Sequence, residues 1–521
     1  MKNLIPYLIH ENYQKNIFAG IINADVMFVD ISGFSAMTQK LMQNGDEGAE
    51  ILSEIINKIF TPAIEEIYAQ NGFISTFAGD AFTAIFPTAN TQTNSVLAAA
   101  SMIQNKFEIN CEQSTKFGNY CLQAKIGISS GDVNWKILPS DVITGYYFRG
   151  KAIQQAAICE THCEVEEILI TPDIIHKFDR CEFQKSGNYF SLKKNVKLTK
   201  HPIKKQELTD TELQPFILNA ILNLNSSGEF RNVVSCFIAF KISENMDAKI
   251  IDIENLIFQY GGYLNKIDFG DKGAMMLVLF GAPIAKSKIY HRAFEFALAV
   301  NNLQNFQTKI GMTYYTAFTG FVGSNLRGEY TALGLSVNLA ARFMTHANWD
   351  TVLVDRYLYR ENNKAYQIDF YDETLFKGFE FKIPSYRLVK KKYTLNETRF
   401  SGKFINRRQE LKLLNNCLNK IKSNKFGGIV YINGPAGVGK SRLVFEFEQS
   451  LPKIDFNWFH LPCDEILNKD FYPIIQFLKI YFNQSENLPK NNLKKEFNDK
   501  IEWLHQQLEN KVLATELLRT K

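Results

Sequence analysis

Two aspartates occupy positions at which a carboxylate can do chemistry. Asp30 ends an apolar run that begins at Val26 and is followed by a Ser-Gly turn, which predicts a buried strand delivering one charge to the rim of a sheet. Asp80 lies in a Gly-Asp turn between two alternating segments, 73–77 and 81–86, which predicts a tight hairpin. If strand and hairpin are neighbours, two carboxylates converge, and Mg²⁺ prefers such oxygens together with a nucleotide's phosphates. The pattern therefore predicts a nucleotide site with two Mg²⁺ ions, with Mn²⁺ as an alternative.

Each aspartate taken alone also has a simpler interpretation, because Asp30 fits a helix cap and Asp80 an ordinary hairpin residue. The elements around them favour a common sheet. Apolar residues recur at helical spacing over residues 46–70, and Pro62 predicts a kink there. Further elements are expected at 93–107 (helix), 121–128 (strand) and after Gly150 (helix). Strand, helix, hairpin, helix and strand in this order predict an α+β fold with a ferredoxin-like core.

An internal repeat organises the rest of the chain. The segment Gln123-Ala124-Lys125-Ile126-Gly127 recurs as Gln307-Thr308-Lys309-Ile310-Gly311. Other segments that match in the same order are 26–30 with 236–240, 71–87 with 261–283, and 147–150 with 331–334. The repeat predicts two copies of one α+β unit. We expect a first domain at 1–200 (copy one), a linker at 201–228, a second domain at 229–391 (copy two), and a region of different character at 392–521.

The two copies have diverged at the metal positions. The position of Asp30 is taken in copy two by Phe240 or Lys241, so the pair of acids is lost there although Asp271 remains. Only copy one is therefore expected to hold two metal ions.

Copy two carries an amide and a guanidinium instead. Asn338 and Arg342 are four residues apart and share one face of a helix, whereas copy one has Gln154 and Ile158 at these places. Singly, Asn338 also fits a helix cap and Arg342 an exposed surface residue. A head-to-tail pseudo-heterodimer of the two copies would have one complete site and one degenerate site.

These motifs together resemble a known family. The order Phe-x-Asp-Ile-x-Gly-Phe at 28–34, a helix, and Phe-x-Gly-Asp-Ala at 77–81 is similar to the first half of a class III nucleotidyl cyclase pair, and to the soluble adenylyl cyclase branch in particular. The resemblance covers about residues 20–390. It implies two tandem ferredoxin-like (βαββαβ) domains, with the cyclase pair complete within one chain, that convert ATP into cyclic AMP and pyrophosphate.

The resemblance also implies a role for each matching residue. Asp30 and Asp80, with the Ile31 carbonyl, would hold the two Mg²⁺ ions, and Lys125 with the turn Ser32, Gly33, Phe34 and Ser35 would contact phosphates. Asn338 would orient the ribose, Arg342 would stabilise charge on the transferring phosphate, and Lys266 and Thr331, with Ala332 beside them, would bind adenine. Taken singly, Lys125 and Lys266 also fit solvated charges at strand edges. A guanylyl cyclase is expected to have Glu and Cys at the two base-reading positions, so the resemblance favours ATP.

One departure concerns regulation. In soluble adenylyl cyclases that respond to bicarbonate, the family pattern has a lysine and an arginine where this chain has Thr76 and Ala157. The resemblance therefore implies catalysis but not bicarbonate activation.

A second motif follows the cyclase-like pair. The apolar segment 428–433 predicts a buried strand, and Gly434-Pro435-Ala436-Gly437-Val438-Gly439-Lys440-Ser441 matches the P-loop pattern before a helix. Gly434, Gly437 and Gly439 would let backbone N–H groups surround phosphates, Lys440 would reach them, and Ser441 would bind Mg²⁺. The segment resembles the start of an α/β P-loop NTPase domain of the AAA/STAND type, which implies a second nucleotide. We find no later strand ending in an acid, and the chain ends inside helical sequence, so a fragment of a longer protein is expected.

Composition narrows the remaining classes. The net charge of the 521 residues is +5, and basic and acidic residues are interleaved, which argues against a nucleic-acid partner. The eight cysteines are scattered without a CxxC pair, as in a cytosolic protein with reduced thiols. We find no signal peptide and no apolar window of about 20 residues, so we expect a cytoplasmic chain without a membrane span.

Two hypotheses of different class remain. The first is an adenylyl cyclase with a C-terminal regulatory region, with a guanylyl cyclase as a weaker variant. The second is a catalytically inactive, cyclase-like scaffold in an ATP-dependent switch. A scaffold has no need for acids in one copy and an Asn/Arg pair in the other, so the sequence favours the cyclase.

Overall fold

The structure is a computed structural model of the whole chain. It describes residues 3–392 except 141, 179–180, 194–195, 197–199, 204–206, 225–227, 287 and 380, and beyond them 404, 407–423, 425–435, 438–451, 471, 474 and 478. Contacts divide the chain into two units, Met1–Lys391 and Lys392–Lys521, and each is described by itself.

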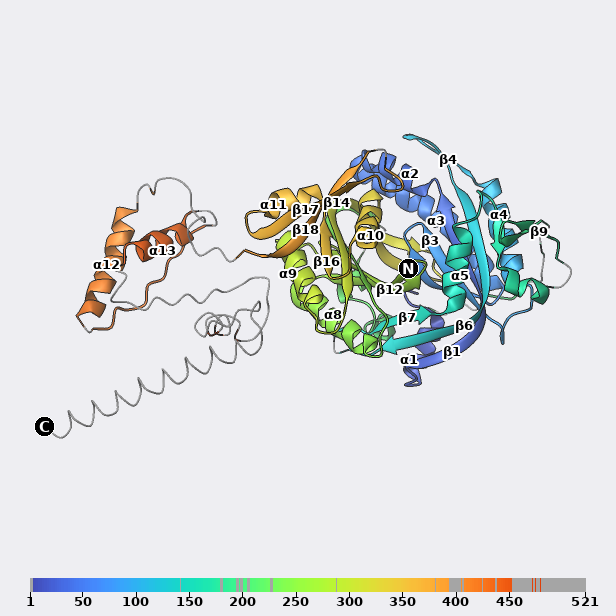
Figure 1. Cartoon of the computed structure of the whole chain (residues 1–521), viewed down its shortest axis with the longest axis horizontal. Coiled ribbons are helices and arrows are strands. Elements are labelled where there is room, and N and C mark those ends of the chain that lie inside the picture. Colours follow the sequence, from blue (N-terminus) through green and yellow to red (C-terminus); the bar gives the residue numbers. More distant parts are fainter. Residues whose placement is uncertain are drawn as a thin grey trace. The chain divides into compact units, whose positions relative to one another are not determined.

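Copy one forms an eight-stranded sheet with helices packed on it (Figure 1). Its elements are β1 (Ala19–Ser32), α2 (Phe34–Met42), α3 (Gly45–Ala69), β2 (Phe73–Ala78), β3 (Ala81–Pro87), α4 (Ser95–Ile109), β4 (Glu112–Thr115), β5 (Gly118–Cys121), β6 (Gln123–Leu138), β7 (Gly145–Arg149), α5 (Lys151–Glu160), β8 (Ile168–Ile170), a 3₁₀ turn (Pro172–Lys177), β9 (Phe183–Ser186) and β10 (Tyr189–Leu192). The strand order is β2-β3-β1-β6-β8-β10-β9, with β7 beside β6. The predicted helix over 46–70 and the hairpin around Asp80 are confirmed.

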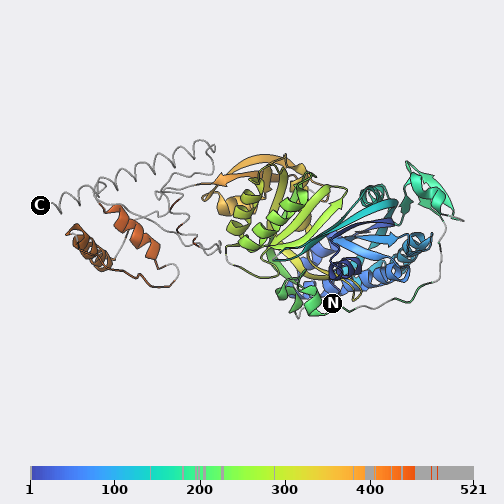
Figure 2. The same ribbon diagram turned by 90° about the horizontal axis from the view of Figure 1, so that it is seen from below.

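Copy two repeats this arrangement. Its elements are β11 (Gly228–Phe240), α8 (Met246–Tyr260), β12 (Tyr263–Gly270), β13 (Gly273–Phe280), α9 (Ile289–Asn301), β14 (Thr308–Gly323), β15 (Gly328–Leu333), α10 (Leu335–His346), β16 (Thr351–Val354), α11 (Arg356–Asn362), β17 (Tyr366–Thr374) and β18 (Ile383–Lys391). The order β12-β13-β11-β14-β16-β18-β17, with β15 beside β14, is that of copy one. The predicted pair of similar α+β units is confirmed, and the two sheets lie side by side in Figure 2.

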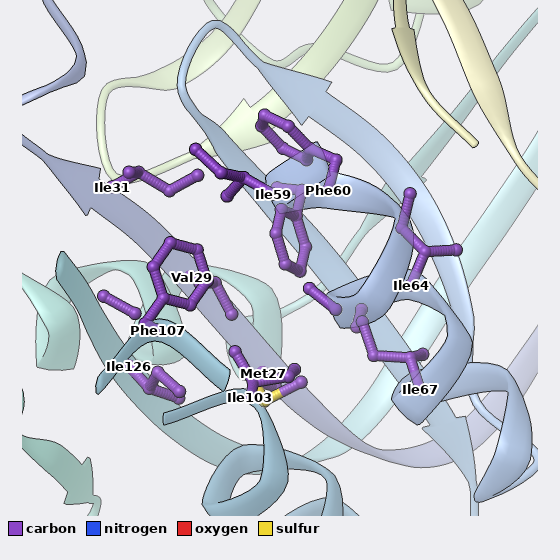
Figure 3. Close-up of a cluster of buried hydrophobic side chains, with 14 of the residues drawn as sticks. Met27, Val29, Ile31, Ile59, Phe60, Ile64, Ile67, Ile103, Phe107 and Ile126 are labelled. Atoms are coloured by element: carbon purple, nitrogen blue, oxygen red, sulfur yellow. The ribbon is translucent and has the colours of Figure 1, made fainter. Parts of the chain in front are cut away.

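The core of copy one explains why β1 can carry a charge at its end. Met27 and Val29 of β1 are fully buried, and they point toward the helices that cover the sheet (Figure 3). Helix α3 contributes Ile59, Phe60, Ile64 and Ile67, helix α4 contributes Ile103 and Phe107, and β6 contributes Ile126. Because side chains alternate along a strand, this packing fixes the register that leaves Asp30 at the rim.

An N-terminal segment joins the two copies. Helix α1 (Tyr7–Gln14) and the short linker helices α6 (Asp210–Leu213) and α7 (Asn219–Leu222) pack beside the sheets. The fully buried Arg327 of copy two donates hydrogen bonds to the Leu4 carbonyl (2.9 Å) and to the Tyr146 hydroxyl (3.2 Å). A buried guanidinium with several acceptors fixes the segments that supply them.

One prediction for the second unit is wrong. Residues 428–433 do not form a strand, and Ile429 and Tyr431 are exposed. A strand exists through hydrogen bonds to a neighbouring strand, and the described part of this unit contains only the helices α12 (Arg408–Lys422) and α13 (Lys440–Gln449). The absence of a later acidic strand, which was also predicted, concerns residues outside the described ones.

Candidate functional site

The two predicted metal ligands lie together at the rim of the copy-one sheet. Strand β1 pairs with β3 so that Asp30 is opposite Ala81, the residue after Asp80. Burial and the charge of Asp30 raise the pKa of Asp80 to about 7. Burial also raises the pKa of Asp30 above its usual range. Two partly buried acids that disfavour each other's charge form a donor set that a divalent cation would stabilise.

This donor set is small. In the described part of the chain, no group of three or more His, Cys, Asp or Glu side chains could hold a metal ion. The fit of Asp30 and Asp80 to Mg²⁺ therefore depends on oxygens from the backbone, from water and from a nucleotide, which is how Mg²⁺ is commonly held.

Three lysines surround Asp30 and oppose the effect of burial on its pKa. Lys125 of β6 is directly across the strand pair from Asp30, and its ammonium donates to the Cys163 carbonyl (2.9 Å). Lys377 and Lys272 of copy two also lower the pKa of Asp30. Neither of these two lysines belongs to a motif, so neither was predicted from the sequence, although Lys272 directly follows Asp271 at the hairpin tip.

A hydrogen-bonded chain crosses from copy two to copy one. The Asn338 amide donates to the Ser35 hydroxyl (3.2 Å), which donates to the Asp80 carboxylate (3.0 Å). A pocket at this point is lined from copy one by Phe34, Ser35, Thr38, Gly79 and Asp80, and from copy two by Ala332, Leu333, Gly334, Val337 and Asn338. The predicted metal and ribose residues therefore share one interface.

The turn after β1 has a geometry that requires glycine. Gly33 has φ of 88° and precedes helix α2, and a Cβ at Gly33 would lie 2.3 Å from the Cys121 carbonyl oxygen. The turn thus places Ser32 at the end of β1, and Phe34 and Ser35 in the first turn of α2. The positive end of the helix dipole faces this region, which suits phosphate.

The two predicted base-reading residues are also at the interface. Lys266 of β12 donates to the Phe77 carbonyl of copy one (2.5 Å), and burial lowers its pKa, while Glu329 and Asp268 oppose that effect. The buried Thr331 of β15 donates to the Asn265 side-chain oxygen (3.0 Å), so it lies next to Lys266 along β12.

Arg342 lies on α10 one turn after Asn338. Its side chain is partly exposed, and the two residues share the helix face toward copy one. The structure thus brings the Asn338 amide of copy two to the acids of copy one, and it sets Lys266 against copy one through the Phe77 carbonyl.

The second, pseudo-symmetric site lacks these groups. Strand pairing sets Ala239 opposite Lys309, as Asp30 is opposite Lys125, so the counterpart of Asp30 is one residue earlier than predicted. Tyr147 stands where copy two has Thr331. Its ring packs on Phe269 with centroids 4.8 Å apart, and its hydroxyl donates to Asp247 (2.8 Å). Tyr147 also lines a pocket on this side of the interface, together with Thr76 of copy one and Lys266 of copy two.

The P-loop region is described in part. Helix α13 begins at Lys440 after Gly439, which has φ of 92°. The Lys440 ammonium donates to the carbonyls of Gly434 (2.7 Å) and Pro435 (2.9 Å). Ser441 is exposed at the start of the helix, and the predicted Gly437 lies outside the described residues.

Comparison with known proteins identifies both regions. The family model described as the adenylate and guanylate cyclase catalytic domain matches residues 20–205. A model described as the AAA ATPase domain matches residues 403–512. The chain therefore carries a nucleotide cyclase catalytic domain followed by an AAA ATPase domain.

Individual relatives narrow the class. Adenylate cyclase type 10 of Oryctolagus cuniculus is 23% identical over 497 residues, which cover 81% of this chain and 30% of that protein. The Homo sapiens protein of the same name is 24% identical over 532 residues, 88% of this chain and 33% of that protein. The chain is homologous to adenylate cyclase type 10, so the resemblance to soluble adenylyl cyclases is confirmed. It spans about a third of the length of these relatives.

Solved structures of the same class are also similar. A class III adenylyl cyclase-like ATP-binding protein from Pseudomonas aeruginosa matches with a TM-score of 0.48 and 12% identity, over 66% of this chain and 85% of that chain. The adenylyl cyclase CyaB of P. aeruginosa matches with a TM-score of 0.29 and 17% identity, over 32% of this chain and 98% of that chain. Within the described residues, no helix of this chain is long and apolar enough to cross a membrane.

Proposed function

We propose that the chain is an adenylyl cyclase that converts ATP into 3′,5′-cyclic AMP and pyrophosphate at the interface of its two copies. The observation that carries this proposal is the pocket in which Asp80 of copy one and Asn338 of copy two are joined through the Ser35 hydroxyl. Homology to adenylate cyclase type 10 over most of the chain supports the same reaction.

The copy-one side serves the metal ions and the phosphates. Asp30 and Asp80, with the Ile31 carbonyl, are the proposed ligands of two Mg²⁺ ions, and Mn²⁺ would use the same oxygens. When bound, the ions favour loss of the ribose 3′-hydroxyl proton and neutralise charge on the triphosphate. The N–H groups of the turn Ser32 to Ser35 and the Lys125 ammonium are proposed to hold phosphate oxygens.

The copy-two side reads the base and stabilises the transition state. A protonated Lys266 donates to adenine N1, and the Thr331 hydroxyl accepts from the exocyclic amine, with Ala332 beside the ring. Guanine carries a proton at N1 and would face the ammonium with a second donor, so this pair favours ATP. Asn338 orients the ribose, and Arg342 stabilises the negative charge that develops on the transferring α-phosphate.

The test is incubation of the purified chain with ATP or GTP and Mg²⁺ or Mn²⁺, with the cyclic product identified by chromatography. We expect cyclic AMP from the wild type and none from Asp80→Asn. Asp271→Asn is the matched control, because Asp271 lies at the tip of the corresponding hairpin in copy two and is exposed. Cyclic GMP as the main product would make the chain a guanylyl cyclase, and no product would favour the scaffold.

We also propose that the P-loop binds a second nucleotide. The Lys440 ammonium, which now donates to two carbonyls of its own loop, would exchange them for β- and γ-phosphate oxygens, and Ser441 would bind Mg²⁺. If both sites bind a fluorescent ATP analogue, Lys440→Ala should lose one of two binding events, and that event should be kept in Asp80→Asn, which would separate this site from the cyclase site.

A further inference from the structure

We propose that Ser35 is a positioning residue that couples the two copies, because its hydroxyl holds the Asp80 carboxylate in place only when Asn338 of copy two is docked. The proposal rests on the proposed cyclase function and adds the means by which copy two organises a carboxylate that belongs to copy one. Ser35 acts through Asp80 and is distinct in this role from the backbone N–H groups of its turn.

The direction of the hydrogen bonds carries the argument. The Asn338 side-chain nitrogen lies 3.2 Å from the Ser35 hydroxyl oxygen, and an amide nitrogen can only donate. The hydroxyl lies 3.0 Å from one Asp80 oxygen, and a carboxylate can only accept. The Ser35 hydroxyl therefore accepts from one copy and donates to the other. Bonds in such a chain polarise and strengthen one another, particularly when the last acceptor is charged.

The fold builds this arrangement on one side only. In copy one, helix α2 stands between β1 and α3 and carries Ser35 in its first turn. In copy two, β11 is followed directly by α8, and residues 241–245 form no helix. At the place of Asn338, copy one has Gln154. Both partners of the hydrogen-bonded chain are thus present at the complete site, whereas the degenerate one has a longer amide, Gln154, and no helix to carry a counterpart of Ser35.

The geometry gives the arrangement a consequence for metal binding. The Ser35 hydroxyl occupies one oxygen of Asp80 and stops the carboxylate from rotating, which leaves the second oxygen in a fixed direction. A carboxylate that is already held in its metal-binding orientation loses less conformational entropy when the metal ion binds. Asn338 is not a proposed metal ligand, and it belongs to the other copy. Metal affinity should nevertheless depend on it, even without a nucleotide.

The experiment measures Mn²⁺ binding to the full chain without nucleotide, from the electron paramagnetic resonance signal of the free ion. Asp80→Ala supplies the background from other sites, including the P-loop. We expect Ser35→Ala to raise the Mn²⁺ dissociation constant roughly tenfold, the ratio expected from loss of one charge-assisted hydrogen bond. Ser35→Thr keeps the hydroxyl and should bind as the wild type does. Thr161→Ala removes an exposed hydroxyl directly after α5 and is the matched control.

A double-mutant cycle tests the coupling itself. If the bonds form one chain, Ser35→Ala with Asn338→Ala should weaken Mn²⁺ binding no more than Ser35→Ala alone. Asn338→Leu adds an independent test if an alanine variant unfolds, because leucine is close to asparagine in size but cannot donate to the Ser35 hydroxyl. It should weaken Mn²⁺ binding as Asn338→Ala does.

The outcomes separate this proposal from the proposed function. Additive effects in the cycle, or wild-type Mn²⁺ affinity in Ser35→Ala, would overturn the coupling even if the wild type makes cyclic AMP. If the wild type makes no cyclic nucleotide but the cycle is non-additive, the coupling stands and the catalytic proposal fails. If the coupling and the catalytic proposal both hold, Ser35→Ala should lower kcat as well as Mn²⁺ affinity. Excess Mn²⁺ should then restore part of the lost kcat.

Discussion

Glu254→Gln should stabilise the cyclase unit at neutral pH, by an amount that grows as the pH rises. Glu254 of α8 is only 6% exposed, and neither of its carboxylate oxygens has a hydrogen-bond partner in the described structure. It faces the other copy, since a Cβ added at Gly145 would lie 2.1 Å from one of these oxygens. Burial raises the pKa of Glu254 to about 8. The folded protein therefore keeps Glu254 protonated at a pH where the unfolded chain has released the proton.

The sign and size follow from linkage. A carboxyl group with a raised pKa in the folded state contributes stability that is full below its unfolded pKa of 4.5 and is lost as the pH rises through about 8. Between pH 5.5 and 7.5, the unfolding free energy of the wild type should fall by about 2.5 kcal/mol through this group. Glutamine cannot ionise, so the variant lacks this loss. For a unit of this size, the difference between the thermal midpoints of variant and wild type should change by roughly 3 °C over this pH range.

The assay compares thermal midpoints of the wild type and the variant at pH 5.5, 6.5 and 7.5 in buffers of equal ionic strength. The difference between the two proteins should increase with pH, whatever its value at pH 5.5. Glu361→Gln, at an exposed position on α11, should give no such trend. A constant difference for Glu254→Gln would mean that the carboxylate reaches water or a cation in solution, and the argument from burial would be wrong.

Four further predictions concern the proposed site. Asp30→Ala or Asp80→Ala should abolish cyclic AMP formation while circular dichroism stays unchanged; activity near the wild-type rate in either variant would remove the two-metal assignment. Arg342→Ala should lower kcat roughly 100-fold with little change in KM, and the opposite pattern would make it a ground-state binding residue. Lys266→Glu combined with Thr331→Cys should shift the kcat/KM ratio toward GTP, unless the purine is read elsewhere. Bicarbonate, added at constant pH and ionic strength, should change activity less than about twofold, or about 0.4 kcal/mol, because a buried anion needs a cationic partner; saturable stimulation would contradict this.

The sequence predicted local structure well where a residue type or a pattern is compatible with one backbone geometry. A turn could be placed at Gly33, and the alternation around Asp80 defined a hairpin, because these depend on backbone sterics and on strand periodicity. The repeat then gave the second copy without further evidence. The strand prediction for residues 428–433 failed for the complementary reason, since an apolar run becomes a strand only by pairing with another strand, and the described residues of this unit contain none.

Contacts across the interface could not be predicted in the same way. The hydrogen bond from Asn338 to Ser35 joins residues far apart in the chain, and the charges of Lys377 and Lys272 reach Asp30 through the packing of two domains. Short motifs contain no information about such distances. The repeat did predict that the groups on opposite halves would be complementary, but not which hydroxyl would join them.

At the degenerate site, the residues that take the places of the proposed site residues show how the two copies differ in role. Ala239 stands at the place of Asp30, and Tyr147 stands at the place of Thr331, with its ring against Phe269 and its hydroxyl donating to Asp247. Tyr147 thus adds a ring contact and a hydrogen bond between the copies, both of which favour association. The degenerate half of the interface can therefore stabilise the association of the two copies. The other half keeps two carboxylates close together, although burial disfavours their charge. A symmetric pair would have to accept that electrostatic cost twice, and the division of tasks is what lets a single chain hold one complete site.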